Sequence, residues 1–177
     1  MRSVASPVVV CTSTDKGEHR AMTMSSFTSL TLTPTPLITF NVKTPSRTLE
    51  AISSSRQFNI HILSGDESGV RVADHFTRGN VEGKGLWGLK FEAVEGESMP
   101  PTLQEEGVMY VLRCKLFDET LGGGMVSVRD HVMVVGEVLE VASGKGEHNG
   151  TEFGLAYADR KYRGVGGVLP TGHDSNV

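Results

Sequence analysis

The chain has 177 residues, of which 21 are glycine and 6% are aromatic, and its formal net charge at pH 7 is −4. This length favours a single domain with a full hydrophobic core, and many glycines with few aromatic residues favour a turn-rich, mainly β fold over a helical bundle. The acidic balance and the lack of a basic cluster argue against nucleic acid binding, and no apolar run approaches the ~18 residues that cross a membrane.

The N-terminal segment and the two cysteines bear on cellular location. Residues 1–12 carry one arginine and a short apolar run, without the charged and long apolar regions of a secretory signal. Cys11 and Cys114 each lie inside an apolar strand pattern, so we expect two buried thiols rather than a disulfide or a metal site. We expect a cytoplasmic protein, or a mitochondrial one if a targeting peptide precedes this sequence.

The first quarter of the chain reads as strands followed by a helix. Residues 7–13 form a β-branched apolar run, and a turn at 15–18 leads into a second strand that begins at His19. A third apolar strand is predicted at 37–42. A proline followed by a serine N-cap predicts a short helix over 46–54.

The middle of the chain continues the alternation of strand and helix. Alternating apolar and polar residues predict a strand over 57–63, and helical spacing predicts a second helix over 66–76. Residues 78–85 are expected to form a loop. A further strand is predicted over 87–94, followed by an irregular connection at 95–107.

The last part of the chain is again β. Residues 108–117 form one strand and residues 126–141 form a long strand or a strand pair, and both are apolar on their two faces. The glycines at 122–124 mark a turn and not a phosphate loop, because no helix pattern follows them. We expect one domain over 1–170 and a disordered tail over 171–177.

Three motifs follow one another along most of the chain. Residues 23–37 read TMSSFTSLTLTPTPL and are followed by PSRT at 45–48, residues 129–138 read RDHVMVVGEV, and residues 155–163 read LAYADRKYR. In this order they resemble the motifs T-x-S-S-F-x-S-L-S-x-x-P-P-L with P-S-x-T, G-D-H-x-x-x-x-G-x-V and L-Y-x-x-x-x-Y of the flavin-reductase-like family. The resemblance runs from about Val8 to about Gly164.

This resemblance implies a fold, a reaction and an assembly. It implies a mainly β, FMN-binding split β-barrel with a few short helices that forms a homodimer. The implied enzyme is an NAD(P)H:flavin oxidoreductase that transfers hydride from NADH or NADPH to FMN, with FAD as the alternative flavin. The reduced flavin would then either pass to an oxygenase partner, as in a two-component monooxygenase, or reduce another acceptor. The alternative is a non-catalytic flavin carrier or interaction module, because one fold hosts many functions.

The resemblance places the first motif along the edge of the flavin ring. The residues concerned are Thr23, Met24, Ser25 and Ser26. Backbone N–H groups and hydroxyls directed at the ring edge stabilise the reduced, anionic flavin, so this turn would tune its redox chemistry. The alternative is a serine-rich turn or a threonine-rich edge hairpin with no ligand.

A second group of residues has the chemistry of a phosphate site. Ser46, Arg47 and Thr48 offer two hydroxyls, a guanidinium and free amides at the start of a predicted helix. Lys43 adds a cation, and the Asn41 amide can bond the ribityl chain or the pyrimidine edge of a flavin. The alternatives are that Ser46 is only an N-cap and that Asn41 is only a turn residue.

The catalytic candidate is His131, which begins a strand in the second motif and would lie within reach of the flavin or the nicotinamide. The alternative is a histidine hydrogen-bonded at the barrel rim. His75 and Phe76 end the second predicted helix, which the resemblance places near the flavin. Arg160 and Tyr162 would cover the flavin face or bind nucleotide phosphates, or would belong to a solvated loop.

Two positions depart from the family's pattern. Residues 33–36 read Thr-Pro-Thr-Pro where the family has Asp-Pro-Pro, which lengthens or reshapes that turn. Arg129 replaces the glycine before Asp-His, and its side chain would clash with a nucleotide or pair with its phosphate. No metal site is expected, and the remaining histidines considered are treated as surface or structural residues: His19, His61, His148 and His173.

Overall fold

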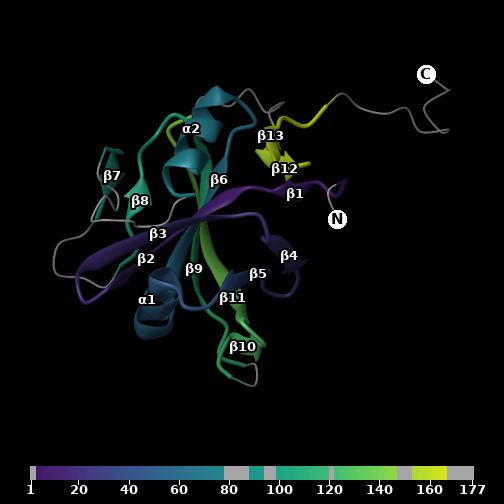
Figure 1. The fold of residues 1–177 in the computed structure, drawn as a ribbon. Helices are drawn as coiled ribbons and strands as arrows, with labels where there is room; N and C mark the ends of the chain where they lie inside the picture. The colour runs from purple at the N-terminus through teal and green to yellow at the C-terminus, as the bar shows by residue number, and fades with distance from the viewer. Residues whose placement is uncertain (1–2, 78–87, 94–98, 120–121, 147–152, 167–177) are drawn as a thin grey trace.

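The computed structural model describes residues 3–77, 88–93, 99–119, 122–146 and 153–166 (Figure 1). Within these residues the chain is mainly β with two short helices, as the sequence predicts. The predicted loop at 78–85 and the predicted tail at 171–177 lie outside the described residues. Among the described residues no helix is long and apolar enough to cross a membrane.

One antiparallel, eight-stranded sheet makes up most of the molecule. In spatial order its strands are β3 (Glu18–Met24), β2 (Val9–Asp15), β6 (Gln57–Leu63), β9 (Val108–Leu116), β11 (His131–Ser143), β5 (Leu37–Lys43) and β4 (Thr28–Thr31), and β10 (Met125–Val128) pairs with β11 beside this path. Figure 1 shows the long strands crossing one another at steep angles, as a strongly twisted sheet requires. Two small sheets flank it: β1 (Ser6–Pro7) with β12 (Ala156–Ala158) and β13 (Lys161–Arg163), and β7 (Phe91–Glu92) with β8 (Thr102–Leu103).

The sheet wraps around a first apolar core. Successive side chains on a strand point to opposite faces, so on β5 Ile38, Phe40 and Val42 are buried while the residues between them face outward. Phe40 and Phe58 are both fully buried and pack edge to face, with ring centroids 5.4 Å apart. Gly136 lies against this pair, because a Cβ at that position would fall 2.4 Å from the Phe58 ring.

A second apolar core lies between the sheet and helix α2 (Glu67–His75) and includes Leu63, Val72 and Phe76. Residues 99–103, which we call the strap, run across the sheet beside this core. Four polar side chains of β2 and β6 bond the strap backbone: Thr12 to Pro101 O, Thr14 to Met99 O, Asn59 to Pro100 O and His61 to Leu103 N. These bonds explain why polar residues occupy buried positions on central strands.

His61 shows how tightly the strap is attached. Its Nε2 accepts the Leu103 N–H at 3.0 Å, and its Nδ1 lies 3.2 Å from the Val10 carbonyl oxygen, to which it donates. The ring is therefore neutral with its proton on Nδ1, and complete burial lowers its pKa to about 4. The sequence analysis treats His61 as a surface or structural residue, and the geometry makes it structural.

Both helices begin where the sequence predicts. Helix α1 (Arg47–Ser55) has Ser46 as its N-cap, whose hydroxyl oxygen accepts the Leu49 N–H at 3.2 Å. Helix α2 has Asp66 as its N-cap, whose carboxylate accepts the Ser68 and Gly69 N–H groups. The same carboxylate has its pKa lowered to about 2, chiefly by a hydrogen bond from the Ser68 hydroxyl.

The cysteines are free and buried in the first core, as predicted. Burial raises the pKa of the Cys114 thiol to about 12, and burial together with the nearby Cys114 raises that of Cys11. Because the thiolate is the reactive form, neither sulfur is suited to nucleophilic or redox chemistry.

Two predicted strands differ from the structure. Within 88–93 only Phe91–Glu92 pair as β7, because Gly88 adopts a φ of +94° in a turn; the ends of the predicted 87–94 strand lie outside the described residues. The 126–141 pattern is a strand pair, β10 and β11, joined by Arg129 and Asp130. Strand β4 was not predicted, since its Thr-Ser-Leu-Thr sequence has no buried face.

Candidate functional site

The outward face of β5 carries a row of polar side chains. Thr39, Asn41 and Lys43 alternate with the buried residues of the strand and therefore share one face. The Thr39 hydroxyl oxygen is buried and has no hydrogen-bond partner among the described residues. A buried oxygen of this kind is unusual in a folded protein, and it indicates that a polar ligand group belongs on this face.

The turn after β3 is attached to the same strand. The Ser26 hydroxyl donates to the Asn41 carbonyl oxygen at 3.0 Å and accepts the Asn41 N–H at 2.9 Å. These two hydrogen bonds to the backbone fix the turn at residues 25–27 against β5 and leave the Asn41 side chain exposed. The Ser26 hydroxyl is thereby used structurally, and the predicted ring-edge contacts of this turn fall to its backbone and to the exposed Ser25.

The start of β11 brings the predicted catalytic histidine to this row. His131 pairs directly with Lys43 across the β11–β5 ladder. Its Nδ1 lies 2.9 Å from the Asp130 carboxylate, whose other oxygen lies 3.9 Å from the Lys43 ammonium. The hydrogen bond with His131 is the main cause of the lowered pKa of Asp130.

Helix α1 begins next to this cluster. The Thr44 N–H and hydroxyl both donate to the Asp130 carbonyl oxygen, at 2.9 and 3.2 Å, and Ser46 follows two residues later. Because Ser46 caps only the Leu49 N–H, the first-turn amides of Arg47 and Thr48 have no hydrogen-bond partner among the described residues. Two such amides and the exposed Arg47 side chain can hold a phosphate.

The remaining predicted residues gather around α2. Thr23 on β3 donates from its hydroxyl to the Ala73 carbonyl oxygen at 2.6 Å, which ties β3 to the helix. At the helix end the His75 and Phe76 rings meet edge to face, with centroids 4.8 Å apart. Tyr162 packs on Tyr157, and burial, then nearby Asp74, raises its pKa.

Tyr162 also lines a surface pocket of about 450 Å³ beside α2, together with Asp66, Arg71, Leu155 and Arg163. Arg160 is exposed at the turn between β12 and β13, where its φ is +60°. The residues of this pocket lie on segments other than β5 and β11, so they form a second group beside the β5–β11 cluster.

Three predicted residues have buried side chains. Met24 is 8% exposed and lies in the first core, Phe76 is 2% exposed and lies in the second core, and Thr48 is 4% exposed on α1. The Met24 and Phe76 side chains pack in the interior and support the site from within. Thr48 offers its backbone amide rather than an exposed hydroxyl.

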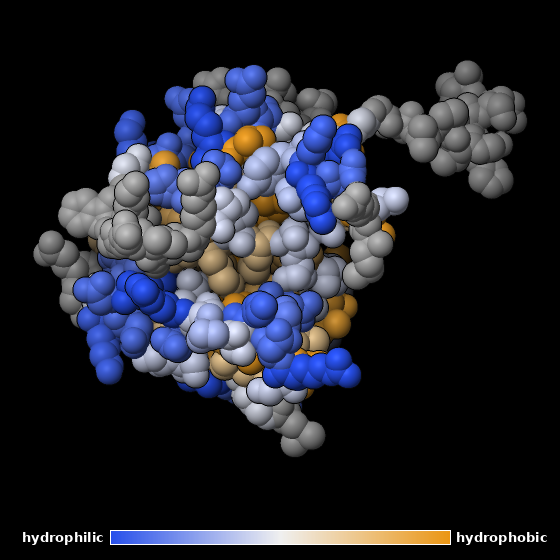
Figure 2. Space-filling model, viewed as in Figure 1, coloured by the Kyte–Doolittle hydropathy of each residue, from blue (hydrophilic) through white to orange (hydrophobic). Residues whose placement is uncertain are grey.

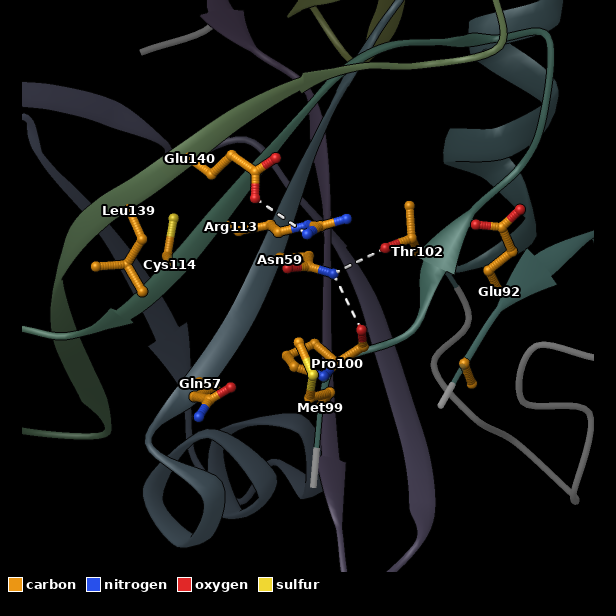
Figure 3. A pocket seen from close by; sticks show the side chains of 11 residues that line it. Gln57, Asn59, Glu92, Met99, Pro100, Thr102, Arg113, Cys114, Leu139 and Glu140 are labelled. Atoms are coloured by element: carbon orange, nitrogen blue, oxygen red, sulfur yellow. Dashed lines mark hydrogen bonds and ion pairs between the residues drawn. The ribbon is translucent and has the colours of Figure 1, made fainter. Parts of the chain in front are cut away.

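A second cavity, of about 370 Å³, lies under the strap and against β6 and β9 (Figure 3). Its walls include Asn59, Thr102 and the Arg113–Glu140 ion pair, with an Nη1–Oε2 distance of 3.0 Å. Figure 3 shows Leu139 and Cys114 on one side of this cavity and Glu92 on the other. Asn59 is bonded to Thr102 and to the Pro100 carbonyl oxygen, Arg113 is paired with Glu140, and Glu92 adds a carboxylate, so this cavity offers little for an anionic cofactor.

Sequence reasoning missed two functional candidates, Thr39 on the polar face of β5 and Thr44, which anchors the β10–β11 turn. Asp130, which is bonded to His131, belongs to the Asp-His pair of the second motif. The period-two alternation of β5 was sufficient to place Thr39 beside Asn41 and Lys43, whereas the Thr44–Asp130 contact joins residues 86 apart. Among the described residues no group of three or more His, Cys, Asp or Glu is arranged to hold a metal ion.

The surface seen in Figure 2 is hydrophilic around its rim and hydrophobic near its hollowed centre.

The chain as a whole matches a known protein family. A family model described as "Flavin reductase like domain" matches residues 1–166. The chain belongs to the flavin reductase-like family.

Relatives of known activity cover nearly the whole chain. The reductase component of 4-hydroxyphenylacetate 3-monooxygenase from Thermus thermophilus is 32% identical over 159 residues, which are 90% of this chain and 88% of that protein. The NADH-dependent FMN reductase SmoA from Agrobacterium fabrum is 29% identical over 140 residues, 79% of this chain and 71% of that protein. The crystal structure of a flavin reductase domain protein from Arthrobacter sp. FB24 has a TM-score of 0.73 at 25% identity and covers 98% of this chain and 94% of that one.

The structure shows the conformation of the two segments at which this chain departs from the family's sequence pattern, residues 33–36 and Arg129. The Thr33–Pro36 segment forms the turn between β4 and β5, and its Thr33–Pro34 peptide bond is cis. Arg129 adopts a φ of +54° in the β10–β11 turn, a left-handed conformation that favours glycine. The family's usual glycine at this position therefore has a conformational reason, and the arginine here is held against that preference.

Proposed function

We propose that this chain is an NAD(P)H:flavin oxidoreductase that binds FMN on the outward face of β5, the start of β11 and the N-terminus of α1. The observation that carries the proposal is the polar cluster of Ser26, Asn41, Lys43, Asp130 and His131, in a chain of this family. The unpartnered Thr39 hydroxyl and the free α1 amides support the fit of a flavin with a phosphate. The NADH-dependent FMN reductase relative supports the same cofactor and the same reductant.

The roles of this chain's residues follow from their positions. The α1 amides, Ser46 and Arg47 would hold the FMN phosphate, and Lys43 would add positive charge nearby. Asn41 and Ser25 would bond the polar edge of the ring, with Ser26 holding both in place. A bound flavin supplies the hydride acceptor, with nicotinamide as donor, and FAD remains the alternative flavin.

His131 would act by position rather than as a nucleophile. Its Nδ1 is bonded to the Asp130 carboxylate, which fixes the ring and leaves Nε2 to face the ligand. From there Nε2 can orient a nicotinamide carboxamide or a polar flavin atom. The outlying group at His75, Arg160 and Tyr162 would cover the nucleotide from the α2 side.

The experiment that tests this function is spectroscopic. Purified protein is expected to bind FMN, with quenching of flavin fluorescence, and NADH or NADPH should bleach the flavin absorbance near neutral pH. Flavin binding without bleaching by either nucleotide would instead support a carrier or interaction module. Failure to bind FMN, FAD or riboflavin would refute both.

The relatives also bear on partners. The Thermus thermophilus protein is the reductase component of a monooxygenase, so we propose that the reduced flavin made by this chain serves an oxygenase. Free, buried cysteines suit the cytoplasmic location expected from the sequence.

We further propose a homodimer that uses the second half of β11. Leu139 and Val141 on this strand are 57% and 61% exposed. Exposed apolar side chains that lie close together commonly mark an interface, and a twofold dimer is the commonest symmetric assembly.

A further inference from the structure

We infer that Arg129 is a phosphate-recognising residue of this site and that its guanidinium binds the dinucleotide substrate, NADH or NADPH, rather than the FMN. The inference rests on the proposed function and adds to it a residue that would set nucleotide affinity. It is carried by the geometry of the β10–β11 turn and by the charges around it.

The turn places Arg129 where a side chain is disfavoured. Val128 pairs with His131, so Arg129 and Asp130 are the two central residues of a tight hairpin. Of these two residues only Arg129 has a positive φ, +54°. Two-residue hairpins with positive φ at the first central position strongly favour glycine there. The backbone conformation does not favour an arginine at this position, so a function of the guanidinium group would explain why it is present.

The turn is also prevented from relaxing. The Asp130 carbonyl oxygen accepts two hydrogen bonds from Thr44, one from the N–H at 2.9 Å and one from the hydroxyl at 3.2 Å. His131 is at the same time paired with Lys43 in the β11–β5 ladder. The hairpin is thus fixed by two consecutive residues, Lys43 and Thr44, against the segment that leads into α1, and Arg129 lies on this fixed turn beside His131.

The charges near the turn leave Arg129 unneutralised. The Asp130 carboxylate is shared between His131, at 2.9 Å, and Lys43, at 3.9 Å. Arg129 is exposed and has no hydrogen bond or ion pair with any described residue. An exposed guanidinium with five free donors, next to the proposed hydride-transfer position, matches a phosphate in both charge and shape.

The bound phosphate can come from either of two sources. FMN carries one phosphate, for which Ser46, Arg47 and the α1 amides already provide donors. NADH carries two phosphates and NADPH three, and apart from Arg160 and Tyr162 on the α2 side no other residue is assigned to them. We therefore assign Arg129 to the dinucleotide.

The test compares Arg129→Gly with the wild type in four measurements on the FMN-loaded protein. These are the KM and kcat for NADH and NADPH, the Kd for NADP⁺ by calorimetry, the Kd for FMN, and the Tm. Loss of one charge-assisted bond predicts a KM and an NADP⁺ Kd about tenfold higher. The FMN Kd should stay within about twofold. The Tm should be equal or higher, because glycine suits the positive φ.

Two further variants complete the design. Arg129→Lys keeps the charge without the planar donors and should show an intermediate loss. Lys16→Gly is the matched control: Lys16 is a cation with a φ of +49° in the β2–β3 hairpin, at the other end of the strand order. It should leave nucleotide affinity unchanged.

The outcomes separate this inference from the proposed function. Unchanged KM and NADP⁺ Kd in Arg129→Gly overturn the inference while wild-type NAD(P)H oxidation still supports the function. A weaker FMN Kd with unchanged nucleotide binding also overturns it and assigns Arg129 to the flavin phosphate. If the wild type oxidises neither nucleotide, the function fails, and the NADP⁺ titrations of wild type and variant still decide the role of Arg129.

Discussion

The Ser26 hydroxyl bridges both backbone polar groups of Asn41, donating to its carbonyl oxygen and accepting its N–H within 3.0 Å. This bridge joins the turn after β3 to the strand that carries the proposed flavin-binding row. We expect Ser26→Ala to lower stability by about 1 kcal/mol, since two exposed hydrogen bonds are exchanged for water. The FMN Kd should rise several-fold, because the turn is no longer fixed against β5.

Thermal unfolding and titration of flavin fluorescence measure the two effects of Ser26→Ala. Ser29→Ala is the control, because Ser29 is an exposed serine on β4 whose hydroxyl forms no hydrogen bond with the described residues. A loss of stability without any change in the FMN Kd would show that the turn has no part in flavin binding.

The N-cap of α1 permits a test that separates folding from phosphate binding. Aspartate caps helices as well as serine does, so Ser46→Asp should retain the bond to the Leu49 N–H and the stability of α1. Its charge would repel a phosphate at the free amides, and we expect the FMN Kd to rise at least tenfold. Riboflavin, which has no phosphate, serves as the control ligand. Equal losses for FMN and riboflavin would contradict a phosphate site here.

The local parts of this fold were predictable from the sequence because they depend on near neighbours. The alternation over residues 57–63 matches β6, and the serine and aspartate caps match the starts of α1 and α2. The family resemblance was confirmed by the match over residues 1–166.

The rest depends on contacts between residues distant in the chain. Strand β4 has no apolar face, so only its pairing with β5 defines it. The bond of Thr44 to Asp130 and the burial of the Phe76 side chain follow from how the sheet closes. The positive φ of Arg129 could not be predicted, because an arginine next to an apolar strand pattern does not indicate a turn. The turn is defined only by the pairing of β10 with β11.

The proposed dimer predicts a change of mass on substitution. Leu139→Lys combined with Val141→Lys places two charges on an exposed apolar surface, which should cost little in a monomer and abolish an apolar interface. Light scattering at micromolar concentration should give twice the 19.0 kDa chain mass for the wild type and the single mass for the variant. Val4→Lys, at another exposed valine, is the control. A wild-type mass of one chain would exclude the dimer.

His131 is expected to matter for hydride transfer and not for flavin affinity. Removal of a positioning group slows the chemical step by about 10²-fold at most, since hydride transfer requires no proton donor. His131→Ala should therefore keep the FMN Kd and slow flavin reduction measured by stopped flow at saturating nucleotide. Asp130→Asn, which removes the carboxylate bonded to Nδ1, should have a smaller effect in the same direction. Wild-type reduction rates in His131→Ala would show that His131 has no role in hydride transfer and would leave Arg160 and Tyr162 as the candidates.

His61 should make the protein less stable in mild acid. Its folded-state pKa of about 4 lies below the ordinary value of 6.5, so the unfolded chain takes up a proton first as the pH falls. The stability provided by the neutral ring is complete above pH 6.5 and is lost as the pH falls toward 4, by about 3 kcal/mol in total. Protonation of Nε2 would also remove the acceptor of the Leu103 N–H and loosen the strap. Urea unfolding at pH 7 and pH 4.5 measures this loss, and His61→Gln, which cannot be protonated, should show a shallower decrease between the two pH values. Because the carboxylates titrate equally in both proteins, identical decreases would show that His61 does not control the acid response.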